Sequence, residues 1–120
     1  REAYEADPIA FAATWGPEEA KLRATILQAR AALPKIQTPR AALEDCARMC
    51  IALGSDGVRG ELTLLRAARA LAASEAAPKV TRDHLARVAS MSLGHRLRRD
   101  PLDEAGATDR VARAVSETLA

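Results

Sequence analysis

The segment LGSDGVRGELTLLRAARALA, residues 53–72, carries the clearest helix signal in the chain. A turn at Gly54 to Gly57 precedes a run rich in Ala, Leu and Arg, which are strong helix formers. The segment therefore predicts a long helix that ends at about Ala76. The first charged residue inside this helix is Arg59, at a position where the helix dipole favours a carboxylate.

Composition indicates a single helical domain over residues 1–120. Of the 120 residues, 48% are hydrophobic, 28% are charged and only 2% are aromatic. These values lie in the globular range and argue against disorder. Because aromatic side chains are scarce, the core must be built from Ala, Leu, Ile and Val, and this composition favours closely packed helices over a sheet.

Prolines and capping residues mark the expected helix ends. A side chain such as Asp or Thr before a helix accepts hydrogen bonds from the free amides, and Pro suits the first helical position. A proline inside or just after a helix is expected to end that helix. The predicted starts are Asp7-Pro8, Gly16-Pro17, Thr38-Pro39, the turn before Arg59, Thr81 and about Asp109, and the predicted ends are Gly16, Pro34, Gly54, about Ala76, near Arg99 and Leu119.

Apolar residues recur at three- and four-residue spacing, which predicts one buried face per helix. The connector 34–39 and the segment 102–108 are expected to lie outside the helices. The sum is an all-α bundle of five or six helices. The predicted faces are Leu22, Ile26, Ala29 and Leu33; Leu43, Cys46 or Ala47, Cys50 and Leu53 or Gly54; Leu85, Val88, Ala89 and Met91; and Val111, Val115 and Leu119.

The net charge and the hydropathy pattern do not by themselves indicate a nucleic-acid or membrane partner. The net charge is +2, which is too small to indicate nucleic-acid binding by itself. No run of about 18 apolar residues is present, so no membrane span is expected. The chain begins at Arg1 without a Met, and we expect it to be a piece of a longer protein.

Motifs for catalysis are missing from the sequence. It contains no Gly-x-x-x-x-Gly-Lys-Ser/Thr phosphate loop, no Gly-x-Ser-x-Gly elbow and no His-Glu-x-x-His. Cys46 and Cys50 share a helix face, but His84 and His95 lie too far along the chain to complete a metal site with them. We expect two buried free thiols, which suit a reducing cytoplasm, and two histidines at surface or capping positions. The prediction is no catalytic residue and no metal site.

The three arginines of the helix predicted after the turn at Gly54 to Gly57 have two interpretations. Arg59 has one local acidic candidate partner, Asp56, and neither Arg66 nor Arg69 has an acid three or four residues away. All three side chains could be solvated or could cover the bundle with their apolar stems. Alternatively, the helix N-terminus and Arg59 together present a site for an anion such as phosphate.

A second cationic cluster is His95-Arg96-Leu97-Arg98-Arg99, just before Pro101. Cations are favourable in the last turn of a helix, so the cluster is expected there for structural reasons. The alternative is an interface with an acidic partner or with phosphate. Single-stranded nucleic acid is not expected, because no aromatic residues are interleaved with the arginines.

The segments CIALGSDGVRGELTLLRAARALA (50–72) and VTRDHLARVASMSLGHRLRRDPLDEAG (80–106) resemble the C-terminal helical domain of the ATPase I subunit of magnesium chelatase, of the bacteriochlorophyll type. The resemblance covers nearly all of the chain and is strongest from Ala41 to Gly106. It implies an AAA+ lid. An upstream core, absent here, would carry the phosphate loop, the magnesium-binding acid and the arginine finger. The segment Gly57 to Glu61 matches the family's sensor 2 motif, so Arg59 would face the γ-phosphate of ATP. Arg66 and Arg69 would line the same cleft or a subunit interface.

The resemblance also implies partners for the parent protein. These are its own core, further I subunits in a ring that is expected to be a hexamer, a second AAA+ protein called the D subunit, and the porphyrin-binding H subunit. With ATP and Mg²⁺, the parent enzyme would drive insertion of Mg²⁺ into protoporphyrin IX. The 120-residue piece would be inactive and would hold no cofactor. Its expected location is cytoplasmic, with no nucleic-acid partner.

Two alternatives remain at this point. One is the lid of a different AAA+ protein, such as a MoxR-type ATPase or the chelatase D subunit. The other is a stand-alone helical interaction or DNA-binding module, which would bind through its arginines with a steep salt dependence.

Overall fold

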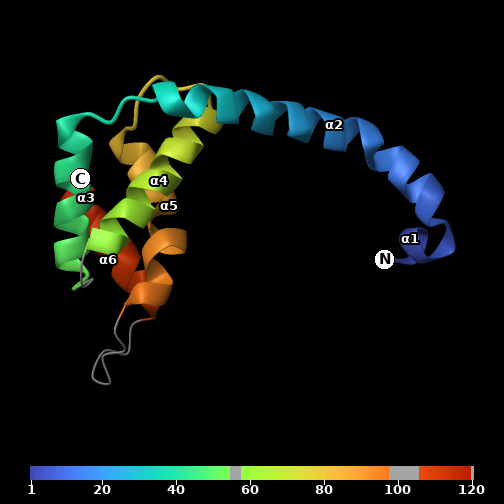
Figure 1. Ribbon diagram of the computed structural model, residues 1–120. Helices are drawn as coiled ribbons and strands as arrows, with labels where there is room; N and C mark the ends of the chain where they lie inside the picture. Colours follow the sequence, from blue (N-terminus) through green and yellow to red (C-terminus); the bar gives the residue numbers. More distant parts are fainter. Residues whose placement is uncertain (55–57, 98–105, 120) are drawn as a thin grey trace.

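The computed structural model describes residues 1–54, 58–97 and 106–119, and these form α-helices joined by short connectors (Figure 1). The predicted all-α class is confirmed. The one β feature in the described ranges is an isolated parallel bridge between Gln37 and Lys79. The helices are α1 (Glu2–Ala6), α2 (Pro8–Ala32), α3 (Arg40–Ala52), α4 (Val58–Ser74), α5 (Arg82–Leu93) and α6 (Ala107–Leu119), with 3-10 turns at Leu33–Lys35 and Gly94–Arg96.

Helices α3 to α6 form a bundle around one core. Met49, Leu64, Leu85 and Leu93 are fully buried there, one or more from each of α3, α4 and α5, and Val111 adds a side chain from α6. Small residues such as Ala68 fill the positions between them and let the helices approach closely. The predicted aliphatic core is therefore confirmed for the bundle.

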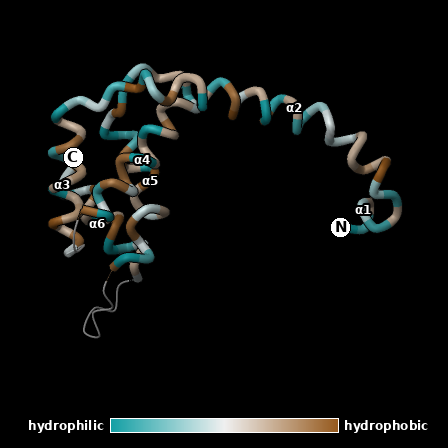
Figure 2. The backbone as a smooth tube through the Cα atoms, in the orientation of Figure 1, coloured by the Kyte–Doolittle hydropathy of each residue, from teal (hydrophilic) through white to brown (hydrophobic). Residues whose placement is uncertain are grey.

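Helices α1 and α2, here called the arm, project away from this bundle (Figure 1). Not one residue of α2 is buried, although the helix has 25 residues. The radius of gyration is 18.3 Å, against about 14 Å for a compact chain of this length. Hydrophobic residues occur along the arm as well as in the bundle (Figure 2). No helix in the described residues is both long and apolar enough to cross a membrane.

The first half of the arm shows one correct and one wrong prediction. Asp7 caps α2 as expected, because its Oδ1 accepts from the amides of Ile9 and Ala10 at 3.0 and 2.9 Å. The predicted break at Gly16-Pro17 is wrong, since α2 continues through Pro17. Proline removes one helical hydrogen bond. On an exposed helix water can solvate the freed carbonyl, and α2 follows a gentle curve rather than ending (Figure 1).

Two predicted helix boundaries in the bundle are also wrong. Thr38 does not cap α3; Pro39 takes the N-cap position and makes no side-chain bond. Helix α5 ends at Leu93 instead of near Arg99, because the backbone tightens into the 3-10 turn at Gly94, a poor helix former. Met91, within α5, is 75% exposed and does not join the predicted buried face.

The predicted apolar faces differ in burial. On α2, Leu22 and Ile26 are exposed, because no element of the chain covers that part of the arm. On α3, Leu43 is exposed while Cys46, Cys50 and Leu53 are buried. Spacing identified the stripe on each helix but did not show which stripes find a partner. The remaining members are Ala29, Leu33, Val115 and Leu119, which pack half-buried against the core, and Leu85, Val88, Ala89 and Val111, which are buried.

A Schellman motif ends α4. The amide of Ala77 donates to the carbonyl of Ala72 at 2.9 Å, and the amide of Ala76 donates to that of Ala73 at 3.2 Å. This geometry requires a left-handed residue, and Ala76 has a φ of 55°. Glycine usually takes this position, because a Cβ makes the left-handed conformation unfavourable. Gly54, with a φ of 61°, plays the corresponding part after α3.

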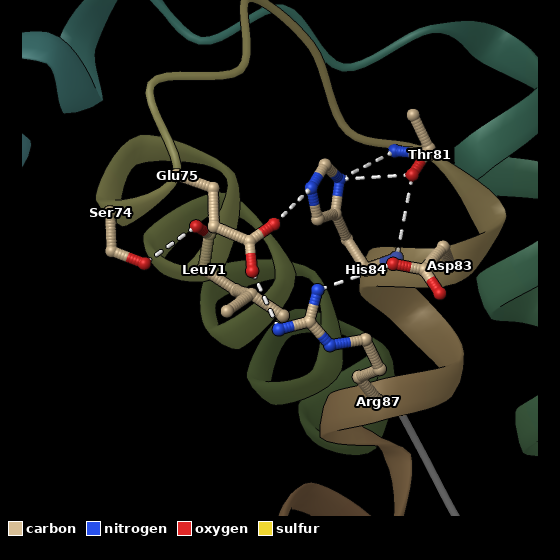
Figure 3. Close-up of polar contacts among 7 residues, drawn as sticks. All are labelled: Leu71, Ser74, Glu75, Thr81, Asp83, His84 and Arg87. Carbon is tan, nitrogen blue, oxygen red and sulfur yellow. Dashed lines mark hydrogen bonds and ion pairs between the residues drawn. The ribbon is translucent and has the colours of Figure 1, made fainter.

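Thr81 and His84 form a capping box at the start of α5 (Figure 3). The Thr81 amide donates to Nδ1 of His84 at 3.1 Å, so Nδ1 is the acceptor of the neutral ring and Nε2 carries the proton. Nε2 lies 3.2 Å from Oε2 of Glu75 and can donate to it. The buried His84 is therefore a capping residue, as expected, and it also links the two ends of the α4–α5 connector.

Glu75 places a negative charge at the C-terminal end of α4, where the helix dipole disfavours it. Arg87 compensates, with its Nη2 2.6 Å from Oε1 of Glu75, and it also contacts Asp83 at 3.3 Å (Figure 3). Chiefly through the hydrogen bond from Arg87, the pKa of Glu75 is held below its usual value of 4.5. A buried carboxylate, Asp45 of α3, similarly pairs with Arg82 of α5 at 2.8 Å.

Replacing Ala76 with Gly should stabilise the bundle. Glycine adopts the left-handed conformation without strain, and this gain exceeds its larger entropy loss on folding, so the free energy of unfolding should rise by about 0.5–1 kcal/mol. Urea denaturation followed by circular dichroism measures the change. Ala112→Gly, on an exposed helical site of α6, is the matched control and should lower stability by about 0.5–1 kcal/mol. A loss of stability in both variants would show that Ala76 is unstrained.

Replacing Glu75 with Gln should make the bundle less sensitive to acid. The folded pKa of Glu75 is depressed, so its carboxylate stabilises the fold above the unfolded value of 4.5 and loses that effect as pH falls through the folded value. The urea midpoint of the native chain should therefore fall more steeply between about pH 5 and 3 than that of Glu75→Gln. Glu19→Gln, on the exposed arm, is the control. Parallel pH profiles for the native chain and Glu75→Gln would contradict the assignment.

Candidate functional site

Arg59 lies in the first turn of α4, which begins at Val58. Its side chain is exposed and makes no hydrogen bond or ion pair with another residue in the described ranges. Its backbone carbonyl accepts from the hydroxyl of Thr63 at 2.8 Å, an ordinary helical contact. Asp56, the predicted local partner, lies outside the described residues. The guanidinium is thus presented to solvent at the positive end of a 17-residue helix.

The two ends of α4 make a useful comparison. Each carries a charge that the helix dipole disfavours: Arg59 at the N-terminus and Glu75 at the C-terminus. Glu75 is compensated by Arg87 and His84. Within the described residues nothing equivalent faces Arg59. The free amides of the first turn and the guanidinium would together suit an external anion.

Arg66 and Arg69, predicted to accompany Arg59, lie in different surroundings. Arg66 is exposed and has no hydrogen bond or ion pair in the part of the chain that the structure describes. Arg69 is half-buried and turns toward the arm, where its Nη2 donates to the carbonyl of Leu33 at 3.0 Å. Ten residues of helix separate Arg59 from Arg69, or about 15 Å. The structure therefore groups Arg66 with the solvent-exposed arginines and assigns Arg69 to a contact inside the chain.

The second cationic cluster is described only in part. His95 is exposed, and Arg96 is half-buried with an Nε that has no hydrogen-bond partner in the described residues. Both lie in the 3-10 turn after α5 rather than in its last helical turn. Arg98 and Arg99 lie outside the described residues.

Cys46 and Cys50 are buried and free, as predicted. Burial raises the pKa of the Cys46 thiol to about 12 and that of Cys50 to about 11. At neutral pH both thiols stay protonated, so neither is an effective nucleophile or metal ligand. Across residues 1–54, 58–97 and 106–119, no group of three His, Cys, Asp or Glu side chains is placed to hold a metal ion.

An open groove of about 330 Å³ lies between the arm and α4. Leu22, Ile26 and Leu33 line it from the arm side, and Ala70 and Ala73 line it from α4. Its exposed walls are almost entirely apolar, with Thr25, Arg30 and Ser74 as the polar residues among its lining. The sequence did not indicate this groove, because spacing predicted the apolar stripe of α2 but not its exposure.

Two contacts between distant parts of the chain have no simple sequence signal. The partnership of Glu75 with His84 spans nine residues and a connector, and the bond from Arg69 to Leu33 spans 36 residues. The acceptor of the Arg69 bond is a backbone carbonyl, which no residue type identifies.

Comparison with known proteins matches residues 43–115 to the AAA lid domain. The chain is 66% identical over 119 residues to the magnesium-chelatase 38 kDa subunit of Rhodobacter capsulatus, covering 99% of this chain and 34% of that protein. It is 64% identical to the same subunit of Cereibacter sphaeroides, covering 99% and 36%. The chain thus spans about a third of the length of these relatives.

A solved structure agrees with this match. The chain resembles a chain in a cryo-EM-based model of the complex between subunits BchI and BchD of magnesium chelatase, with a TM-score of 0.53 and 55% identity. The likeness covers 98% of this chain and 33% of that one. These findings confirm the resemblance seen in the sequence: the chain belongs to the AAA lid domain family.

Proposed function

We propose that this chain is the lid of the ATPase I subunit of a magnesium chelatase of the bacteriochlorophyll type. The parent ring would couple ATP hydrolysis to insertion of Mg²⁺ into protoporphyrin IX. The observation that carries the proposal is the 66% identity over 119 residues to the Rhodobacter capsulatus 38 kDa subunit. The exposed Arg59 at the start of α4 supports the lid role, since it leaves a guanidinium free for a phosphate.

Arg59 would act as the sensor 2 arginine. A cation at the positive end of α4 is unfavourable while it stands alone. When the γ-phosphate of ATP approaches, the guanidinium and the free amides both gain charge-assisted hydrogen bonds. The arginine would thereby stabilise charge on the phosphate and report the nucleotide state to the lid.

The rest of the nucleotide site would come from the parent's core. This chain supplies no phosphate loop, so ATP and Mg²⁺ would be bound mainly by residues outside it, and the 120-residue chain alone is expected to be inactive. Arg59 is the group here whose environment fits a phosphate contact. Arg66 is a candidate for the same cleft or a subunit interface, while Arg69 is already engaged by Leu33.

The proposed partners follow from the same assignment. The similar solved structure is a complex of BchI with BchD, which supports contact with the D subunit of a chelatase. A ring of I subunits, expected to be a hexamer, the porphyrin-binding H subunit and a cytoplasmic location belong to the proposal. The relatives reported above are 38 kDa subunits, which favours the I subunit over a MoxR-type lid.

Replacing Arg59 with Ala should abolish most ATP turnover in the parent context. The test is a chimera in which this chain replaces the matching third of the Rhodobacter capsulatus subunit. We expect kcat for ATP hydrolysis to fall about tenfold or more, equivalent to about 1.4 kcal/mol in the barrier, with ring assembly intact. Arg113→Ala, at an exposed position of α6, is the control. Unchanged binding and turnover in Arg59→Ala would remove the sensor assignment.

Replacing Arg59 with Gln should stabilise the isolated chain slightly. The change removes a cation that opposes the helix dipole, so the free energy of unfolding should rise by about 0.3–1 kcal/mol at low salt. Urea denaturation at low and high ionic strength checks both the sign and the screening. Arg66→Gln, near the middle of the helix, should have almost no effect. A clear loss of stability in Arg59→Gln would mean that Arg59 has a structural partner.

A further inference from the structure

The bond between Arg69 and Leu33 joins the bundle to the arm. Nη2 of Arg69, on α4, lies 3.0 Å from the carbonyl oxygen of Leu33 at the end of α2. The Nε of the same guanidinium is buried and has no hydrogen-bond partner in the described residues. Burying a guanidinium nitrogen without a partner is unfavourable. The hydrogen bond from Nη2 to Leu33 offsets part of this cost.

The Leu33 carbonyl is a good acceptor for a cation. It stands at the C-terminal end of a 25-residue helix, where carbonyls lack helical partners and the dipole is negative. It also accepts from the amide of Ile36 at 3.3 Å, a longer and neutral bond. A charge-assisted bond from Arg69 is the stronger of the two.

Immediately after this point the chain is fastened to the bundle. The Gln37 amide donates to the Pro78 carbonyl at 3.0 Å, and the Val80 amide donates to the Gln37 carbonyl at 2.9 Å. Ile36, just before Gln37, is buried. Before Leu33 the situation is the opposite, because α2 has no buried residue. The direction of the arm is therefore set over the short stretch from Ala29, which packs half-buried against the core, to Leu33.

Apolar packing is incomplete where the end of α2 at Leu33 meets Arg69 of α4, a contact here called the joint. Ala29 and Leu33 pack against the core, but Leu22 and Ile26 face the open groove of about 330 Å³ beside α4. A groove of this size leaves space for the arm to tilt. The polar bond from Arg69 adds to the packing of Ala29 and Leu33 in resisting such a tilt.

We propose that Arg69 is a positioning residue that fixes the direction of the arm relative to α4. Because Arg59 and Arg69 lie on one continuous helix, a rotation of α4 at its N-terminal end is carried to the arm. This link to nucleotide rests on the proposed function, whereas the fixing of the arm does not. Arg69 would then couple the phosphate-facing end of the lid to a helix outside the bundle.

Spin labels at Glu19→Cys on the arm and Ser90→Cys on α5 test this in the 120-residue chain. Both sites are exposed, and the buried Cys46 and Cys50, whose thiol pKa values are raised, should not react with the label. Pulsed electron resonance gives the distribution of distances between the labels. Glu19 lies about 20 Å along the helix from Leu33, so a tilt of about 15° shifts the label by about 5 Å.

We expect Arg69→Gln to broaden or shift the distribution by about 5 Å. Arg69→Lys, which keeps a cationic donor, should restore part of the narrow distribution, and Arg66→Gln should leave it unchanged. An unchanged distribution in Arg69→Gln would overturn the proposal. So would a general loss of helix in both Arg69 variants by circular dichroism, because the role is confined to the joint.

The outcome separates this proposal from the proposed function. The labelled chain is measured without nucleotide or core, so its result does not depend on sensing by Arg59. If the arm loosens in Arg69→Gln while Arg59→Ala leaves ATP turnover unchanged in the chimera, the positioning role of Arg69 is supported and the sensor role of Arg59 is overturned. If turnover depends on Arg59 but the distance distribution does not change in Arg69→Gln, the lid function is supported and the positioning role of Arg69 is overturned.

Discussion

Close contact between α4 and its neighbours is the constraint on which the rest of the structure depends. Gly60, Leu64, Ala68 and Ala72 recur at four-residue spacing on α4, and all four are buried. With few aromatic residues available, small side chains on this stripe allow the helices to approach until aliphatic groups fill the core. This one helix packs in the bundle, contacts the arm through Arg69 and carries Arg59 in its first turn.

Two charges at the ends of the same helix oppose its dipole, Arg59 at the start and Glu75 at the end, whereas Glu61 in the first turn is favourably placed. At the C-terminal end, Glu75 pairs with Arg87 and lies within hydrogen-bond distance of His84. His84 is also a member of the capping box of α5. At the N-terminal end the described residues offer Arg59 no such partner. A fold that compensates one unfavourable charge and leaves the other exposed is consistent with a site completed by a ligand from outside.

Sequence reasoning identified several features that local chemistry decides, although it misplaced the cap of α3 and the end of α5. The Asp7 and Thr81 caps, the long helix after the turn at Gly54 and the burial of the two cysteines all follow from nearest-neighbour preferences and spacing. It failed at Pro17, where exposure let a helix continue through a proline.

Sequence reasoning could not predict the tertiary contacts. The exposure of Leu22 and Ile26 depends on which element packs against them, and the partner of Arg69 is a backbone carbonyl 36 residues away. For the candidate site, Arg59 was identified from a broken local rule together with the family resemblance. The structure adds that its side chain is exposed and that Arg69 has a different task.

The unburied arm has a consequence for how the chain unfolds. Helix α2 buries no residue, so its melting exposes little apolar surface and changes the heat capacity little. Its hydrogen bonds are supported mainly by local helix propensity, which is weak in water for isolated helices. Thermal melting of this chain should therefore begin with gradual fraying of α2 at temperatures where the bundle is intact. Cooperative unfolding would then belong to α3–α6, and amide exchange in the arm would report local opening rather than global stability.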